Sequence, residues 1–315
     1  RIVVVCKFYL SIFINMGVNC LILLQRTKEG VFKAGQPVIG TLKYKVDKPT
    51  KFISLDICLS GKGKCRWSET ESDESTTYYS NKEEYVNICK NLLTDQKVLS
   101  GTYERVFEFF LPENIPTSVK NKICTIEYKV LVTFVKDTFF GAKYKFDAEV
   151  LVYGYVSPCS PEPLIFGLQK NLFSLTSNNN LDVKAEIERT CLTPGENIIL
   201  NLTINNDTDV PITIKTELMK YFTYVSDRKK TKIDKESVKT TSGYSPSVKE
   251  RSLLKMKCIV PTLPSLYSIQ HTKILLGEYK VRVTAKLPFP HINAVVEVPV
   301  VIGESKDHAG ATVVS

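Results

Sequence analysis

The sequence predicts an all-β protein made of two tandem antiparallel β-sandwiches of the immunoglobulin-like kind. Three observations lead to this prediction: several segments alternate apolar and polar residues with period two, one segment recurs in each half of the chain, and long amphipathic helical patterns are missing. Hydrophobic residues make up 43% and charged residues 24% of the 315 residues, which excludes disorder as the dominant state.

The repeat is clearest at residues 127–133, EYKVLVT, and 278–284, EYKVRVT, where six of seven residues agree at an offset of 151. A proline turn precedes each copy, at 111–116 and 260–264. Earlier still, Ala34-Gly35-Gln36 leads into VIGTLKY and Pro194-Gly195-Glu196 into IILNLTI. The matches keep their order, so we infer two copies of one domain. Coincidence among strand-like sequences is the alternative.

Residues 1–15 are mostly apolar and begin with Arg. The uncharged run from Phe8 to Leu24 is borderline for a membrane span of about 20 residues, so a signal peptide or an anchor is one interpretation. We prefer the other interpretation, in which the protein starts at Met16 and residues 1–15 are a non-native or upstream extension. A buried first strand is expected over 18–26.

The first sandwich is expected over 16–156 and the second over 164–304, followed by a disordered tail at 305–315. Three prolines within residues 157–163 exclude a continuous strand or helix, which predicts a short hinge there. Amphipathic strands are expected at 143–150, 197–205 and 280–287, where apolar and polar residues alternate. Half-buried strands need a second sheet to cover their apolar faces, hence the sandwich. The apolar spacing of Tyr85, Ile88, Cys89 and Leu92 allows one short helix at most.

The nine cysteines show no Cys-x-x-Cys spacing, which excludes a zinc ribbon or a thioredoxin-like motif. Their odd number and irregular spacing favour reduced thiols and a cytosolic protein. Asn201 and Asn206 match the glycosylation sequon, which matters only in a secreted chain.

Catalytic and cofactor signatures are not found, so we expect no enzyme, no cofactor and no metal. His291 is expected in a solvated turn and His308 in the tail, and neither they nor His271 lie in a metalloprotease motif. Nucleotide-binding glycine patterns and a serine-nucleophile elbow are missing too. The net charge of +9 is spread too diffusely for a nucleic-acid binder.

The chain resembles the α-arrestins, the arrestin-domain-containing proteins of the arrestin superfamily. The resemblance spans 16–304 and rests on ordered motifs: MGVNCLILL after Met16, AGQPVIG at 34–40, the segment 101–110, LPENIPTS at 111–118, the strand at 126–134, CLTPGENI at 191–198, Asn205-Asn206, YKVRVTAKLPFP at 279–290 and VPVVIGE at 298–304.

This resemblance implies the arrestin fold and a non-enzymatic cytosolic adaptor at the plasma membrane or endosomes. Such an adaptor binds cytosolic tails or loops of membrane receptors or transporters and directs their trafficking, endocytosis and ubiquitination. Many α-arrestins recruit ubiquitin ligases through Pro-Pro-x-Tyr, but the sequence contains no Pro-Pro pair, so direct recruitment by that route is not expected. Visual and β-arrestins carry paired lysines on the first strand, where this chain has Leu23 and Leu24.

Three candidate contact surfaces follow from the residues themselves. The first is a basic stretch at 228–235, which could bind acidic headgroups or phosphorylated tails. The alternative is that this stretch is a solvated hairpin. At an expected hairpin tip, Phe139 and Phe140 point to opposite sides, so one could contact a partner or a bilayer, with packing against the neighbouring domain as the alternative. An exposed sheet edge could also accept an extended peptide. The basic stretch consists of Arg228, Lys229, Lys230, Lys232 and Lys235.

A different class of function stays open beside the adaptor. In that alternative the chain is a secreted or membrane-anchored two-domain recognition protein that uses residues 1–24 as signal or anchor and carries glycans at Asn201 and Asn206. Paired cysteines would favour this alternative, whereas free thiols would favour the adaptor.

Overall fold

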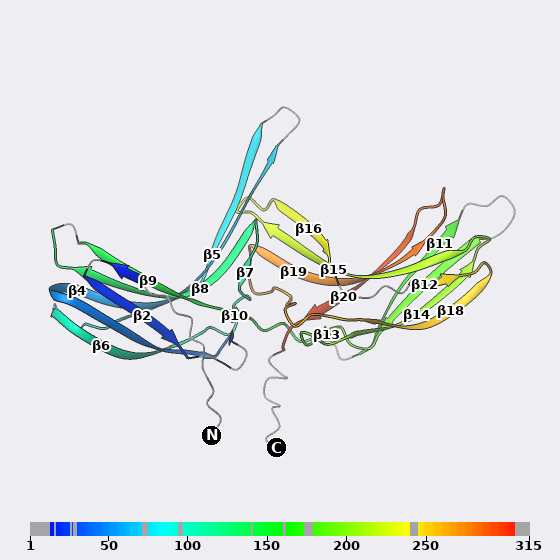
Figure 1. Ribbon diagram of the computed structural model, residues 1–315. Coiled ribbons are helices and arrows are strands. Elements are labelled where there is room, and N and C mark those ends of the chain that lie inside the picture. The colour runs from blue at the N-terminus through cyan, green and yellow to red at the C-terminus, as the bar shows by residue number, and fades with distance from the viewer. Residues whose placement is uncertain are drawn as a thin grey trace, which may run out of the picture. The chain divides into compact units, whose positions relative to one another are not determined.

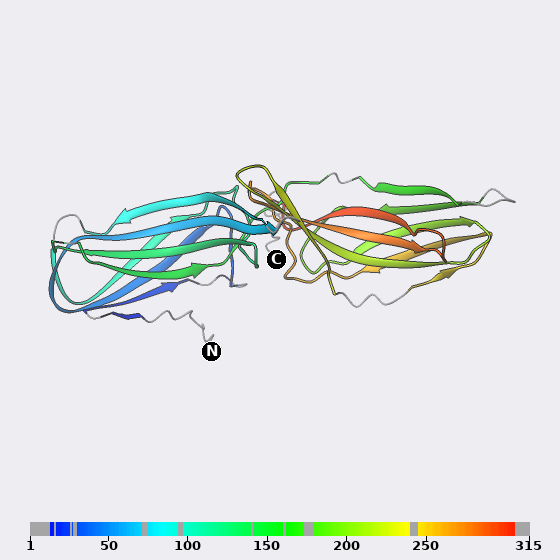
Figure 2. The same ribbon diagram turned by 90° about the horizontal axis from the view of Figure 1, so that it is seen from above.

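The computed structural model shows a chain whose regular elements are all β-strands (Figures 1 and 2). It describes residues 13–15, 17–25, 27, 30–70, 75–93, 97–139, 141–159, 162–172, 179–239 and 245–305. Within these residues we find no helix with the length and hydropathy that a membrane crossing requires. The predicted all-β class is confirmed. Residues 1–12, Phe140, and the tail beyond Ser305 lie outside the described residues.

The strands divide between two compact units. The first unit contains residues 1–155 together with two short segments from the second half of the chain, 225–230 and 271–274. The second contains 156–224, 231–270 and 275–315. Sequence reasoning did not anticipate that the two short segments would join the first unit.

The first unit is organised around one strand of 34 residues, β4 (Pro37–Thr70). Its first part pairs with β2 and β6, and its second part pairs with β8 and β5. The register shifts between Val46 and Thr50 and again between Phe52 and Ser54, where β4 exchanges one set of partners for the other. The other strands are β1 (Phe13–Asn15), β2 (Val18–Leu24), β3 (Phe32–Lys33), β5 (Thr76–Asn91), β6 (Lys97–Phe110), β7 (Val119–Lys120), β8 (Cys124–Lys136), β9 (Lys143–Val150) and β10 (Val152–Tyr153).

Strict alternation explains the core of this unit. In β8, the residues from Cys124 to Phe134 at even positions are buried, and the residues between them are exposed or half-buried. Phe134 is fully buried among Tyr44, Phe52 and Phe146. The short helix allowed by the spacing of Tyr85 and Ile88 does not form, because that segment pairs with β4 as β5. Before Met16, β1 pairs antiparallel with β2.

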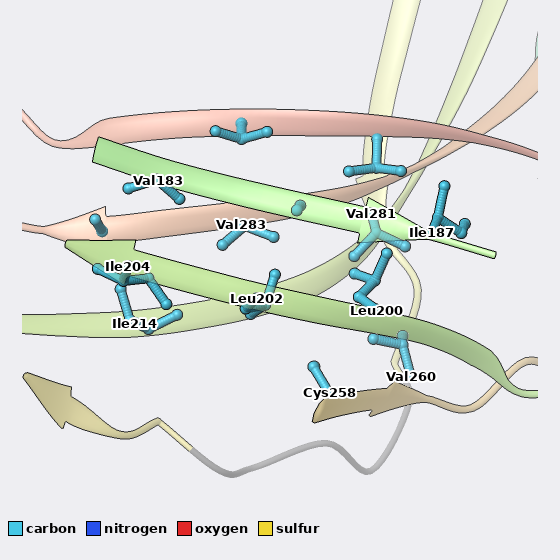
Figure 3. Packing of buried hydrophobic residues seen from close by; sticks show 14 of the residues in the cluster. Val183, Ile187, Leu200, Leu202, Ile204, Ile214, Cys258, Val260, Val281 and Val283 are labelled. Atoms are coloured by element: carbon cyan, nitrogen blue, oxygen red, sulfur yellow. The ribbon is translucent and has the colours of Figure 1, made fainter. Parts of the chain in front are cut away.

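The second unit is a sandwich of a four-stranded sheet, β11-β12-β14-β18, and a six-stranded sheet built on β13-β20-β19-β15-β16. Figure 3 shows the side chains of its core, among them Val183, Leu202 and Val283, which are at most 1% exposed. The strands are β11 (Leu164–Leu172), β12 (Asn179–Ile187), β13 (Cys191–Leu192), β14 (Ile198–Asp207), β15 (Ile212–Val225), β16 (Thr231–Ser237), β17 (Ser247–Val248), β18 (Ser252–Val260), β19 (Leu275–Lys286) and β20 (Ala294–Ile302).

The cysteines correct the sequence analysis. Cys58 and Cys89 form a disulfide, as do Cys159 and Cys191, so the prediction of reduced thiols is wrong for these four residues. The first pair arises because the register of β4 and β5 places Cys58 directly opposite Cys89. The number of residues between two cysteines does not reveal this register, because strands that are far apart in sequence can pair and bring their cysteines together. Four other cysteines are free and buried: Cys20, Cys65, Cys124 and Cys258.

The predicted hinge residues 157–159 and 162–163 form no strand. The backbone N–H of Ser157 donates to Gln270 Oε1 at 2.8 Å, and Cys159 is bonded to Cys191. Both contacts lie in the second unit.

Candidate functional site

The basic stretch forms the hairpin between β15 and β16. Its turn closes where the N–H of Ser226 donates to the carbonyl of Lys230 at 2.9 Å and the N–H of Lys230 donates to Ser226 Oγ at 3.0 Å. Lys229 has a φ of 65°, a left-handed conformation unusual for a residue other than glycine. The turn is therefore a defined element and not a loose loop.

The five basic side chains of this hairpin do not converge on one point. Lys230 Nζ lies 3.3 Å from Glu69 Oε2 and 5.8 Å from the ring centre of Tyr79, whereas Lys235 Nζ lies 5.5 Å from the ring centre of Tyr221. Arg228 and Lys229 are exposed in the turn, and Lys232 is half-buried. The stretch thus serves several local contacts, and its binding to an anionic partner stays a prediction.

Backbone groups hold the turn 225–230 against the hairpin formed by β4 and β5, which Figure 1 draws in cyan. The carbonyl of Val225 accepts hydrogen bonds from Asn81 Nδ2 at 3.0 Å and from Cys65 Sγ at 3.5 Å. The N–H of Asp227 donates to the carbonyl of Ser80 at 2.9 Å. These bonds explain why the turn belongs to the first unit.

The segment 271–274 is held on the same hairpin by one carboxylate. Glu83 Oε2 accepts from Thr272 Oγ1 and from the N–H of Lys273, each at 2.8 Å. Tyr85 contacts the same Thr272 hydroxyl at 2.8 Å, and burial raises the pKa of Tyr85. Glycine at position 63 is required here, because a Cβ would lie 2.3 Å from the Tyr85 hydroxyl and 2.6 Å from Ile274 Cδ1.

Two family models match the chain. The model described as arrestin (or S-antigen), N-terminal domain, matches residues 20–156, and the model described as arrestin (or S-antigen), C-terminal domain, matches residues 177–306. The chain belongs to the arrestin family. Each model matches one of the two copies that the internal repeat defines, and the two tandem sandwiches are the arrestin fold.

The chain is also similar to two curated arrestin domain-containing proteins. Arrestin domain-containing protein 5 of Bos taurus is 25% identical over 311 residues, covering 87% of this chain and 88% of the relative. Arrestin domain-containing protein 5 of Homo sapiens is 22% identical over 307 residues, covering 87% of this chain and 85% of the relative.

The two arrestin domains carry matching apolar loop tips. Phe139, between β8 and β9, is 97% exposed, and Phe289, between β19 and β20, is 98% exposed. They lie 150 residues apart, close to the offset of the repeat, and Ile292 adds a second exposed apolar side chain (80%) to the second tip. Sequence analysis singled out Phe139 but passed over Phe289, although the repeat was sufficient to find it.

The second tip is supported by hydrogen bonds. Lys170 Nζ donates to the carbonyls of Ile292 and Asn293, and Asn293 Oδ1 accepts from the N–H of Leu287 at 3.0 Å. These bonds hold three backbone groups at the loop, while Phe289 and Ile292 remain exposed.

Polar side chains across β15, β19 and β20 form a cluster that sequence reasoning missed. Glu297 accepts hydrogen bonds from Tyr221 Oη and, at 2.8 Å, from Arg282 Nη2, and it pairs with Lys280 at 3.4 Å. Burial alone would raise the pKa of Glu297, but these hydrogen bonds outweigh it and lower the pKa to about 2.

The lowered pKa of Glu297 should make the thermal stability of the protein depend on pH. Its pKa falls from 4.5 in the unfolded chain to about 2 in the folded one, so its stabilisation is complete above about pH 4.5 and is lost as the pH falls toward 2. We expect Glu297→Gln to flatten the decrease in thermal midpoint over this range. Glu186→Gln is the control, because Glu186 is exposed and forms no ion pair among the described residues. Equal pH profiles for wild type and Glu297→Gln would contradict the assignment.

Asn206 cannot serve as a glycan acceptor in the folded arrestin domain. It is fully buried, and its Nδ2 donates to the carbonyls of Val210 and Lys249, each at 2.9 Å. Asn201 is exposed on β14. The expectation of two glycan sites in the secreted alternative is therefore wrong at Asn206.

Within the described residues, no group of three or more His, Cys, Asp or Glu side chains could hold a metal ion. The N–H of His291 donates to the carbonyl of Pro288, as expected for a turn residue. His271 has a φ of 59° and directly precedes Thr272, whose hydroxyl donates to Glu83. His308 lies outside the described residues.

Proposed function

We propose that this α-arrestin is a non-enzymatic adaptor that binds cytosolic tails or loops of membrane receptors or transporters and directs their trafficking, endocytosis and ubiquitination. The observation that carries the proposal is the match of both arrestin domains, in order, over 20–156 and 177–306. An adaptor acts through its surfaces, and this chain presents several candidate surfaces, among them the exposed side chains of Phe139 and Phe289. The proposed location is the cytoplasm, with peripheral association to plasma membrane or endosomes.

A pull-down from a membrane fraction tests the adaptor. The bait starts at Met16, captured proteins are identified by mass spectrometry, and a parallel sample uses phosphatase-treated extract. An unrelated β-sandwich protein of similar positive charge serves as the control for nonspecific capture. Enrichment of receptors, transporters or ubiquitin ligases supports the proposal. Capture of extracellular proteins instead would overturn it.

A second candidate, a secreted or membrane-anchored recognition protein, is favoured by one observation, the two disulfides Cys58–Cys89 and Cys159–Cys191. Disulfides persist mainly in oxidising compartments. Alkylation of free thiols in intact cells, followed by mass spectrometry, separates the candidates. Alkylated Cys58 and Cys159 indicate a reducing compartment and the adaptor, whereas protection of both indicates the secreted protein.

Because Phe139 and Phe289 are exposed at the loop tips, we expect each domain to contact a membrane through its tip. Burying one phenylalanine side chain stabilises an attached state by about 1.5–3 kcal/mol, or roughly tenfold or more in affinity. We expect Phe139→Ser and Phe289→Ser each to reduce co-sedimentation with anionic vesicles. Phe110→Ser is the matched control, because Phe110 is 61% exposed but lies on strand β6 rather than at a loop tip. An equal loss in the control would show that exposure alone, without the tips, governs attachment.

A further inference from the structure

Strand β6 lies at the margin of the first unit (Figure 1). Among the described residues it pairs with β4 alone, and the register is unbroken over residues 101–110. In an antiparallel pair, residues alternate between those whose backbone N–H and C=O groups bond the neighbouring strand and those whose groups point away from it. One set of backbone groups on β6 therefore faces an open edge.

Hydrogen bonds on both sides of β4 identify the outward set. The N–H of Leu111 donates to the carbonyl of Gln36 at 3.1 Å, so the odd-numbered residues at this end of β6 bond to β4. The carbonyl of Ile39 accepts from the N–H of Gln25, on the other side of β4, at 2.8 Å. Ile39 lies directly opposite Glu108, so the backbone groups of Glu108 point away from β4.

Alternation extends this result along the strand. The backbone groups of residues 104, 106, 108 and 110 point to the open edge, because the register between them is unbroken. Lys90 supports this direction, since it comes from β5 rather than β4 and its Nζ donates to the carbonyl of Glu108 at 2.7 Å. One outward carbonyl is thus occupied by a lysine, and no described strand pairs with the other outward groups.

The same even-numbered residues carry exposed side chains. Val106 is 75% exposed and Phe110 is 61% exposed, whereas Phe107 and Phe109 are at most 5% exposed and face the core. Between the two exposed apolar side chains lies Glu108, which is exposed and forms no ion pair among the described residues. The open edge therefore presents an apolar, an acidic and an apolar side chain in turn, and we call Val106, Glu108 and Phe110 the β6 row.

We propose that β6 accepts an extended segment of a partner's cytosolic tail or loop as an added antiparallel strand, with a basic residue opposite Glu108 and apolar residues opposite Val106 and Phe110. This refinement rests on the adaptor function proposed above. Main-chain hydrogen bonds give affinity in this mode, and cross-strand side-chain pairs set the sequence that is accepted. Cytosolic segments beside a membrane span carry an excess of Lys and Arg, which complements Glu108.

A second copy of the chain fits this edge less well. If β6 paired with β6 of a second copy so that Val106 opposed Val106, Glu104 would oppose Glu108. If Val106 opposed Phe110 instead, Glu108 would oppose Glu108. Like charges directly opposite each other destabilise a sheet, and a basic segment avoids both conflicts.

Anisotropy of a fluorescent peptide tests the side-chain pairs. The peptide carries valine, lysine and valine at alternate positions with serine between them, and the full chain should bind it. Glu108→Lys should weaken binding by about three- to tenfold, because an attractive cross-strand pair becomes a repulsive one. The same variant should bind a peptide with glutamate in place of the lysine. Glu186→Lys is the control, since it makes the same change at an exposed position of the second unit. Equal losses in both variants would overturn the proposal.

Backbone methylation separates strand addition from apolar contact. A peptide N-methylated at its valines and lysine keeps every side chain but loses the N–H groups that bond β6, so it should not bind. The control peptide, N-methylated at the serines, should bind. Hydrogen exchange gives a second measurement, in which the peptide should slow the amides of Val106 and Phe110 and leave those of Phe107 and Phe109 unchanged. Binding of the first methylated peptide, or equal slowing of all four amides, would contradict strand addition.

Lys90 should compete with the added strand, because it occupies the carbonyl of Glu108. Lys90→Met leaves that carbonyl open and should tighten peptide binding by about two- to tenfold, the range of one hydrogen bond. Lys82→Met is the matched control, since it removes another exposed lysine from β5. Weaker or unchanged binding in Lys90→Met would contradict strand addition at this carbonyl.

Failure of the β6 row and failure of the adaptor are distinguishable. If the pull-down enriches membrane proteins equally with wild type and with Glu108→Lys, the adaptor stands and the β6 row is wrong. If the peptide binds but the bait captures only extracellular proteins, the adaptor function is wrong and the partner assignment fails with it. Sedimentation velocity covers the other occupant: a dimer that Val106→Glu dissociates, without peptide binding, would assign the edge to a second copy and overturn the proposal.

Discussion

Phe134→Ala is expected to lower the free energy of unfolding of the first arrestin domain by about 3–5 kcal/mol. Phe134 is fully buried on β8, and its ring centre lies 5.3 Å from that of Tyr44, 5.6 Å from Phe52 and 6.0 Å from Phe146. Truncation removes the apolar burial and all three edge-on aromatic contacts, and it leaves a cavity that the paired strands cannot close.

Urea unfolding followed by tryptophan fluorescence measures this effect. Trp67 is the single tryptophan of the chain, lies on β4 and is 5% exposed, so its emission reports on the first domain. Phe139→Ala is the matched control, since Phe139 is 97% exposed at the end of the same hairpin. We expect the control to change the free energy of unfolding by less than about 0.5 kcal/mol. A loss below about 1 kcal/mol for Phe134→Ala would contradict the packing described here.

Asn206→Ala is expected to destabilise the second arrestin domain by about 2–4 kcal/mol. The side chain donates to the carbonyls of Val210 and Lys249 and accepts from Thr208 Oγ1 at 2.7 Å, all at a fully buried position. Alanine removes all three hydrogen bonds, each of which contributes about 0.5–1.5 kcal/mol, while the two carbonyls keep the hydrogen bonds that they accept from Thr208 Oγ1 and Ser252 Oγ.

Asn201→Ala is the matched control, because it makes the same substitution on the same strand β14 at an exposed position. Hydrogen exchange of the β14 amides measures the local loss, since the single tryptophan lies in the other domain. Equal exchange rates in the two variants would show that Asn206 does not stabilise the fold.

The fold was largely readable from the sequence because its signals are local. The strands β9 and β19 each have one solvent-exposed and one buried face, so their residues alternate between polar and apolar. This alternation can be recognised without knowing which strand is the partner. The repeat of 127–133 at 278–284 then showed two copies of one sandwich. The helical spacing of Tyr85 and Ile88 misled, because β5 pairs with β4 and tertiary pairing overrides a short local pattern.

The candidate surfaces were less readable. The basic stretch 228–235 looks like one cluster in sequence, but the hairpin directs Lys230 to Glu69 and Lys235 to Tyr221. Conversely, the sequence does not show that the backbone groups of Val106, Glu108 and Phe110 point to an open edge, which follows only from the pairing of β6 with β4. The tip residue Phe289 could have been found from the sequence, because it lies 150 residues after Phe139, close to the repeat offset of 151.

The sequence alone therefore determined the all-β class, the two tandem sandwiches and the membership in the arrestin family, since alternation, repetition and motif order are properties of consecutive residues. Only the tertiary structure decided which cysteines pair, that Asn206 is buried, and that residues 225–230 and 271–274 join the first unit. The physical reason is register. Which residues of two distant strands oppose each other depends on core packing along their whole length, and a one-residue shift would exchange every buried side chain for an exposed one.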